Sequence, residues 1–196
     1  MKADELYRLL KQQLGPWFTA HGFKRLPCSR LAYQRLRGQF YQTIWFQCDK
    51  WGWDRYAGSS FFVNFSVSRT PTDFEVGPGH RRHERLNFFL TDEELETARG
   101  FRDAIVARIP PPPEAYFETL EAHFSKHSSN AAGMMAVVRS QFEPEPIPYR
   151  RHQDFSLRYW QPQDVQGWAA FITAVLPRAT TDMASWTVEE GPGSAT

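Results

Sequence analysis

Residues 40–48, FYQTIWFQC, and 60–68, SFFVNFSVS, decide the fold of this chain. One face of the first stretch carries Phe40, Gln42, Ile44, Phe46 and Cys48, and one face of the second carries Phe61, Val63, Phe65 and Val67. A period of two is that of a β-strand, whose successive side chains point to opposite faces. We therefore predict two strands with one face packed on helices and the other, from Phe62 to Ser68, half-exposed.

Further strands are expected on both sides of this pair. Residues 22–26 and 31–37 are short segments bounded by turn residues, and residues 154–160 alternate Phe155, Leu157 and Tyr159. Short connections favour antiparallel neighbours, so we predict an antiparallel β-meander of four to five strands.

The helices follow from apolar residues at a spacing of three and four. Leu6, Leu9, Leu10 and Leu14 predict an N-terminal helix that Pro16 kinks or restarts, with Gly22 as a left-handed cap at its end. Val165 to Leu176 predict a C-terminal amphipathic helix that Pro177 ends.

A helical hairpin is predicted in the middle of the chain. Thr91 and Glu94 match a capping box that opens a helix reaching Ile109, and the prolines at 110–113 end it. A second helix is predicted over 114–126, and the two helices together form an αα-hairpin. The fold class is therefore α+β.

Length and composition indicate one globular domain. The chain has 196 residues, of which 41% are hydrophobic and 23% charged. We predict a single α+β domain over 1–188 and a flexible tail over 189–196, with irregular excursions over 69–85 and 141–153. A net charge of +1 provides no overall field for nucleic acid or an anionic membrane.

The compartment is predicted from what the chain lacks. Cys28 and Cys48 form no metal or disulfide motif, and the N-terminus MKADELYRLLKQQL has no apolar signal-peptide core. The apolar runs fall short of the ~20 residues that a membrane span requires. We expect a cytoplasmic protein with reduced thiols, no cofactor and no membrane partner.

The first third of the chain resembles a bacterial family catalogued as a domain of unknown function, number four-three-zero-four. The resemblance rests on features that occur in the same order: a leucine helix with Pro16, Gly22-Phe23-Lys24, the Tyr33/Arg35 strand, Ile44-Trp45-Phe46-Gln47, Trp51, and Phe62-Val63-Asn64-Phe65. It implies an N-terminal helix packed on an antiparallel sheet, with helices after it. It implies no catalytic residue, because none of these motifs is catalytic.

The candidate partner-binding residues are aromatic and basic. Trp51, Trp53, Arg55 and Tyr56 cluster in one predicted loop, where rigid rings could form a protein contact or could fold back over the core. Arg81, Arg82 and Arg85 form the strongest local positive charge, in what we predict to be a second loop. Solvation and neutralisation by acids are the simpler explanation of this charge.

Two histidine pairs are weak metal candidates. His123 and His127 would share a helix face, and His80 and His83 lie among arginines that would repel a cation. Imidazoles at the edge of the core are the simpler explanation of the first pair, so we predict no metal site.

These features favour a non-enzymatic protein-binding module, of accessory or immunity type, whose partner the sequence does not identify. A nucleic-acid-binding protein that uses the same aromatic and arginine residues is the first alternative, and a histidine-based metal-dependent hydrolase is the second.

Overall fold

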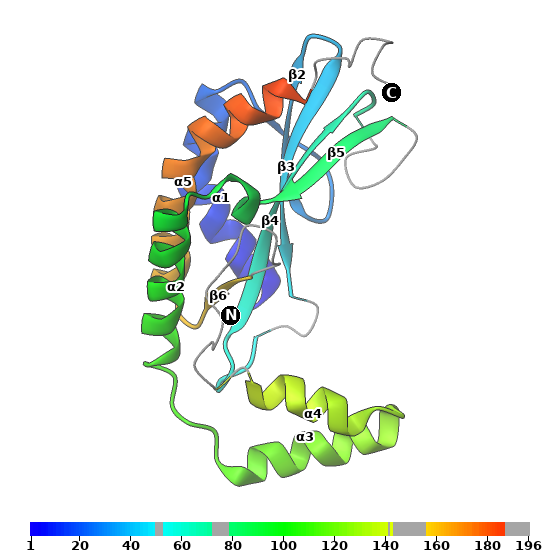
Figure 1. Ribbon diagram of the computed structural model, residues 1–196, viewed down its shortest axis with the longest axis vertical. Helices are drawn as coiled ribbons and strands as arrows, with labels where there is room; N and C mark the ends of the chain where they lie inside the picture. Colours follow the sequence, from blue (N-terminus) through cyan, green and yellow to red (C-terminus); the bar gives the residue numbers. More distant parts are fainter. Residues whose placement is uncertain (50–52, 72–78, 141, 143–155, 187–196) are drawn as a thin grey trace, which may run out of the picture.

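The computed structural model describes residues 1–49, 53–71, 79–140, 142 and 156–186, and shows an α+β fold (Figure 1). The elements, in chain order, are α1 (Ala3–Ala20), β1 (Lys24–Arg25), β2 (Leu31–Arg37), β3 (Phe40–Cys48), β4 (Ser59–Ser68), β5 (His80–Arg85), the 3-10 turn η1 (Leu86–Phe89), α2 (Asp92–Val106), α3 (Glu114–His127), α4 (Ala131–Ser140), β6 (Leu157–Tyr159) and α5 (Pro162–Ser185).

The described strands form one antiparallel sheet in the order β1-β2-β3-β4-β5, with β6 also pairing with β4. The register places Ile44 opposite both Tyr33 and Phe65, so the apolar positions of three strands lie on one face. The predicted meander is thus confirmed, including the strand within 154–160, of which residues 154 and 155 lie outside the described part.

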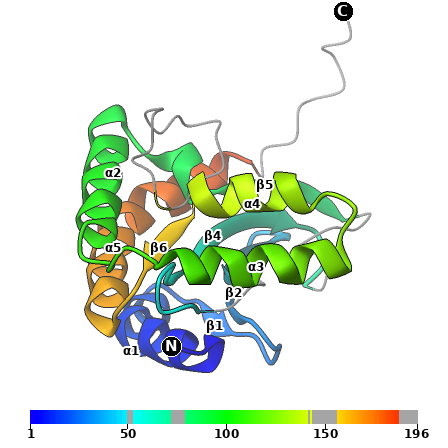
Figure 2. The same cartoon turned by 90° about the horizontal axis from the view of Figure 1, so that it is seen from below.

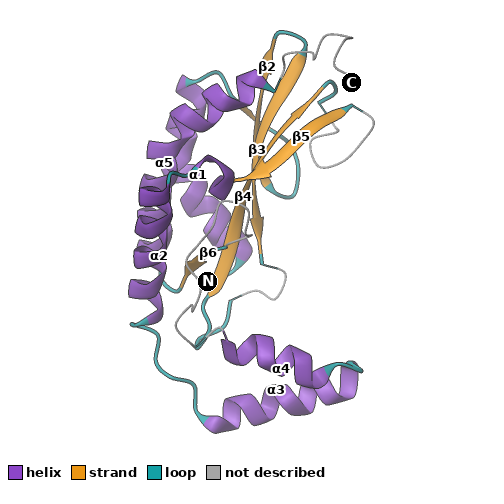
Figure 3. Ribbon diagram, in the orientation of Figure 1, coloured by secondary structure: helices purple, strands orange, loops and turns teal. Residues whose placement is uncertain are grey.

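Helices α1, α2 and α5 cover one face of this sheet (Figure 3). The core is rich in rings: Phe18 of α1 stacks on Tyr33 of β2 with centroids 4.0 Å apart, and Trp168 of α5 meets Phe101 of α2 edge-on at 4.6 Å. Full burial of one large apolar side chain, whether Phe or Leu, contributes roughly 1.5–3 kcal/mol to the stability of the fold. This gain explains why the leucine side of α1 faces the sheet. The helix-packed face of the sheet is therefore the one predicted from the alternation.

The opposite face of the sheet differs from the prediction. Asn64, Ser66 and Ser68 are buried rather than half-exposed, while Phe62 is partly exposed. Part of this burial comes from contacts with β5, since His83 stacks on Trp45 at 5.0 Å and lies 3.2 Å from the side-chain oxygen of Asn64. Alternation identified the two faces but not how much of the second would be covered.

Both internal prolines are tolerated within their helices. α1 continues through Pro16 to Ala20, and α5 continues through Pro177 to Ser185, so the predicted end of the C-terminal helix was wrong. After Pro177 the helix still buries Ala179, Thr180 and Met183. This burial offsets the missing N–H of one proline. Gly22 has the predicted left-handed conformation, with φ +77°.

The helical hairpin is formed by a different pair of helices. The capping box of Thr91 and Glu94 is confirmed, and it starts α2. However, α3 packs against α4, which was not predicted, and not against α2. The proline segment 110–113 carries the chain away from α2, and the apolar residues of α4 supply the partner for α3 (Figure 1).

Candidate interaction surface

The predicted aromatic loop contains a tight turn between residues 54 and 58. The backbones of Asp54 and Gly58 exchange two hydrogen bonds of 2.8 Å, and one carboxylate oxygen of Asp54 accepts from the N–H groups of Tyr56 and Ala57 at 2.7 and 2.9 Å. Gly58 has φ +68°, which a side chain would disfavour. The turn is therefore set by its own residues before any partner arrives.

β6 and the residue that follows it hold this turn in place. The indole N–H of Trp53 donates to the carbonyl of Trp160 at 3.1 Å, and the indole N–H of Trp160 donates to the carbonyl of Arg55 at 3.0 Å. The guanidinium of Arg158 donates to the carbonyl of Ala57 at 3.0 and 2.6 Å. These contacts join residues about a hundred positions apart in the chain, which no local pattern could have indicated.

The side chains of the turn are divided between the surface and the interior. Trp53 is 39% exposed, and Arg55 is exposed with its guanidinium 4.9 Å from the ring centroid of Tyr56. Tyr56 is partly buried and meets Tyr116 of α3 edge-on at 5.0 Å. Trp51 lies outside the described residues. The loop thus both presents rings and covers a neighbouring helix, and each sequence interpretation accounts for a part of it.

Tyr116 connects the α3–α4 hairpin to this turn. Burial, together with the charge of Asp54 and a hydrogen bond to that carboxylate, raises the pKa of Tyr116 to about 12. A phenol that donates to a carboxylate stays protonated at neutral pH, so this bond persists there. The root of the hairpin is therefore fixed by one polar and one aromatic contact.

The hairpin has a small core of its own. Phe117, Phe124 and Met135 are buried there, and they are flanked by side chains such as Leu120 and Val138 that are only partly buried. Between Ala131 and Ser140, α4 carries a single charged side chain, Arg139, which pairs with Glu114 at 3.0 Å. A helix that is apolar on nearly all sides is normally buried on nearly all sides. Sequence reasoning missed this element, although the scarcity of charge was a usable signal.

The three predicted arginines lie on a strand and not in a loop, which corrects the prediction. β5 (HRRHER) is an edge strand of the described sheet and pairs with β4. Its polar sequence lacks the alternation of apolar residues by which a strand is recognised in a sequence. Each arginine lies over an aromatic ring: Arg81 over Phe40 at 5.6 Å, Arg82 over Phe88 and Trp186 at 4.7 and 4.8 Å, and Arg85 over Phe62 at 4.2 Å. Arg82 also pairs with Glu84 at 3.1 Å. Such stacking holds the guanidinium groups in defined positions.

The two predicted patches do not form one surface. His80 is paired with Ser68, whereas the turn joins the other end of β4 at Ser59. At about 3.3 Å per residue these ends lie roughly 30 Å apart. Arg85, paired with Asn64, is the arginine of β5 whose partner lies closest along β4 to the turn.

The histidine pairs do not form a metal centre within the described residues. The rings of His123 and His127 are 4.7 Å apart on the exposed side of α3, and those of His80 and His83 are 6.3 Å apart on β5. No group of three or more His, Cys, Asp or Glu side chains in the described part of the chain is arranged to hold a metal ion. Burial raises the pKa of the Cys48 thiol, which disfavours its reactive thiolate form.

Comparison of the chain with protein-family models, curated proteins and solved structures found no match. The resemblance over the first third of the chain therefore stays a prediction. Among the described residues, no helix combines the length and the apolar character needed to cross a membrane.

Proposed function

We propose that this protein is a non-enzymatic protein-binding module, and that the turn at residues 53–56 forms part of its contact surface. The observation that carries the proposal is the rigid presentation of Trp53 and Arg55. Both residues are exposed, while the indole N–H of Trp53 donates to the carbonyl of Trp160 and the backbone carbonyl of Arg55 accepts from the indole of Trp160. Tryptophan and arginine are the residue types that most often dominate the energetics of protein interfaces.

Preorganisation strengthens this argument. A loop that must become ordered on binding loses part of its interaction energy to conformational entropy. Here the carboxylate of Asp54 and the guanidinium of Arg158 already fix the backbone of the turn. The α3–α4 hairpin, which contacts the turn through Tyr116, extends the same region with further apolar side chains.

The test is quantitative affinity capture from cells of the encoding organism, with the full-length chain as bait. We expect a protein that wild type captures to be lost with Trp53→Ala and with Arg55→Ala. Lys24→Ala, a change at an exposed position of β1, is the matched control and should retain it. The melting temperature of each variant shows whether the fold is intact.

Arg55→Ala is the more decisive variant, because the hydrogen bond from Trp160 ends on the backbone carbonyl of Arg55 and survives the change. Capture of the same proteins by wild type and by both folded turn variants would contradict the proposal.

A further inference from the structure

Four arginines lie together at one tip of the sheet, on the face that packs on the helices. We call Arg37 of β2, Arg69 after β4, and Arg81 and Arg82 of β5 the arginine tip. Arg69 and Arg81 both lie over the ring of Phe40, at 5.7 and 5.6 Å from its centroid. Arg37 is paired with Phe40 across β2 and β3, so the two side chains lie on the same face. These positive charges are therefore grouped around one buried ring.

The register of the strands brings these arginines together. Arg69 follows Ser68, the last residue of β4, and its backbone N–H donates to Gly79 at 2.8 Å, just before β5. A shift of register leaves Arg81 with no residue opposite it on β4, which allows Arg81 and Arg82 to lie on the same face. In Figure 1 this tip is the upper end of the sheet, beside the end of α5.

The charge of the tip is only partly balanced within the described part of the chain. Glu84 pairs with Arg82 at 3.1 Å, whereas no described acid pairs with Arg37 or Arg81. Both of these arginines are exposed. Their guanidinium groups are thus accessible to a ligand and already lie at defined places on the sheet.

Arg35 and Gln42 extend the tip inward. Arg35 lies over Phe23, with its guanidinium 4.4 Å from the ring centroid, and donates to the side-chain oxygen of Gln42 at 2.9 Å. Burial, together with the charge of Arg37, lowers the pKa of Arg35, so the two guanidinium groups repel one another. Gln42 is buried, and its Nε2 donor has no hydrogen-bond partner in the described part. An anion at the tip would reduce this repulsion.

The spacing of Arg37 and Arg81 fits an extended peptide. From β2 to β5 there are three steps between neighbouring strands, which together span about 14 Å. Side chains on one side of an extended chain recur about every 7 Å, so two carboxylates four positions apart span the same distance. Guanidinium groups bind carboxylates through two parallel hydrogen bonds. An acidic segment that crosses the tip can therefore reach both arginines.

The aromatic rings of the tip favour an acidic protein segment over single-stranded nucleic acid. Proteins bind single strands through exposed rings on which the bases stack, in addition to phosphate contacts. Here Phe40 is only 2% exposed beneath two guanidinium groups, and Trp186 lies 4.8 Å from the guanidinium of Arg82. The net charge of +1 also provides no long-range attraction for a polyanion.

We propose that the arginine tip binds an extended acidic segment of a partner protein, whose carboxylates pair with Arg37 and Arg81. The tip lies at the opposite end of β4 from the turn at residues 53–56. This inference therefore goes beyond the proposed function, and gives the module a second contact surface with its own chemistry.

The experiment uses a displayed library of linear peptides, selected against the full-length protein and eluted with salt. We expect the selected peptides to carry Asp or Glu at alternate positions. Their dissociation constants, measured by fluorescence anisotropy of labelled peptides, should rise about tenfold or more with Arg37→Glu and with Arg81→Glu. They should also rise with the salt concentration. Glu84→Gln should lower them, because it removes the acid that competes for Arg82.

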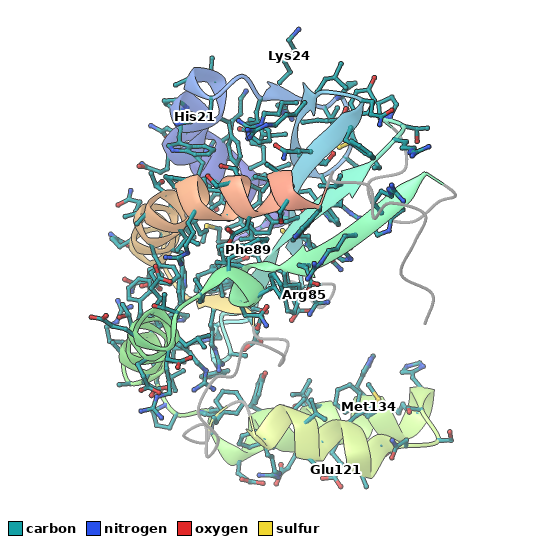
Figure 4. All side chains as sticks on the ribbon, turned by 45° about the horizontal axis from the view of Figure 1, so that its top comes forward. His21, Lys24, Arg85, Phe89, Glu121 and Met134 are labelled. Carbon is teal, nitrogen blue, oxygen red and sulfur yellow. The ribbon has the colours of Figure 1, made fainter. Side chains whose placement is uncertain are left out.

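Lys126→Glu is the matched control, because it makes the same change of charge at an exposed position near the end of α3. The α3–α4 hairpin, on which Figure 4 labels Glu121 and Met134, lies at the end of the molecule opposite to the tip. Figure 2, seen from below, accordingly has this hairpin in front of the sheet. The control should leave the dissociation constants unchanged. Circular dichroism shows whether each variant is folded.

The acids of the chain itself are the alternative occupant. Asp73, Glu75, Glu189 and Glu190 lie outside the described residues. If the wild type binds no acidic peptide, but a variant with Asn and Gln in place of these four acids does, the chain occupies its own tip and the inference is overturned.

Selected peptides without an acidic excess, or dissociation constants that neither folded arginine variant changes, would also overturn the inference. Tighter binding of a labelled oligothymidylate than of the peptides, lost with Arg81→Glu, would overturn it in favour of single-stranded nucleic acid. If Trp53→Ala and Arg55→Ala still abolish capture in those cases, the proposed function stands without the tip. Acidic peptides that bind the tip while both turn variants keep every captured protein would instead remove the proposed function and leave this inference.

Discussion

Replacing Gly58 by alanine tests the close approach on which the turn at residues 54–58 depends. An alanine Cβ at this position would lie 2.4 Å from the backbone oxygen of Tyr159, and the residue has φ +68°. The obstacle is backbone of the strand β6, which cannot rotate away as a side chain can. We therefore expect Gly58→Ala to separate the turn from β6 and to destabilise the whole fold.

Two contributions set the magnitude. Holding alanine in the left-handed conformation costs roughly 1–2 kcal/mol. Forcing one additional carbon into a packed site costs about 1–3 kcal/mol more. The free energy of unfolding should thus fall by about 2–5 kcal/mol, out of a total of about 5–15 kcal/mol that is typical of a domain.

Urea unfolding followed by circular dichroism measures this change, and Gly38→Ala is its control. Gly38 also has a positive φ, +61°, but an added Cβ would meet nothing within 4 Å. The control therefore loses only the conformational part, about 1–2 kcal/mol. Equal destabilisation by the two substitutions would refute the close approach of the turn to Tyr159, and with it the rigid presentation of Trp53.

Three further predictions concern the polar contacts of the helices and of the hairpin. Asp164→Ala should lower the free energy of unfolding, measured in urea, by about 2–4 kcal/mol. The reason is that this buried carboxylate caps α5 by accepting the N–H groups of Trp160 and Gln161 and also pairs with the guanidinium of Arg108. Asp164→Asn should lower the free energy of unfolding less. Burial acts to raise the pKa of Glu94, but hydrogen bonds from Arg178 and Thr91 outweigh it and hold the pKa below its usual value of 4.5. The stability that this ion pair contributes is present above pH 4.5 and is lost as the pH falls through the lowered pKa. The difference in the free energy of unfolding between wild type and Glu94→Gln should therefore shrink in acid. A constant difference across that range would contradict the ion pair. Tyr116→Phe should remove one phenol that ionises near pH 12 from the ultraviolet titration. It should also weaken the hairpin contact, an effect that is full below pH 10 and disappears as the pH rises through 12. Loss of a phenol that ionises near pH 10 instead would contradict the bond between Tyr116 and Asp54.

The local features of the fold could be predicted from the chain itself. The strands β2 to β4 were found because apolar residues on alternate positions carry the geometry of a strand within a few residues. The capping box of Thr91 and Glu94 was found for the same reason, since both its partners lie within one helical turn. The unusual composition of their loop singled out Trp53 and Arg55 as candidates, but it left open whether they are exposed, which the structure shows them to be.

Features that depend on distant partners could not be predicted in this way. β5 has arginine and histidine where a strand pattern requires apolar residues, and it is a strand because it pairs with β4. The continuation of α5 beyond Pro177 depends on burial of Met183 against the main core. The sequence does not reveal this burial, and a proline by itself predicts that the helix ends there.

The sequence by itself determined which residues form the first strands, which of their faces is apolar and where α2 begins, because these properties follow from the spacing of neighbouring side chains. Only the tertiary structure decided that α3 pairs with α4, that Asn64 and Ser66 are buried, and that Trp160 and Arg158 hold the turn beside Trp53. The physical reason is that the free energy of these contacts comes from groups far apart along the chain, which meet only after the sheet and its helices have packed.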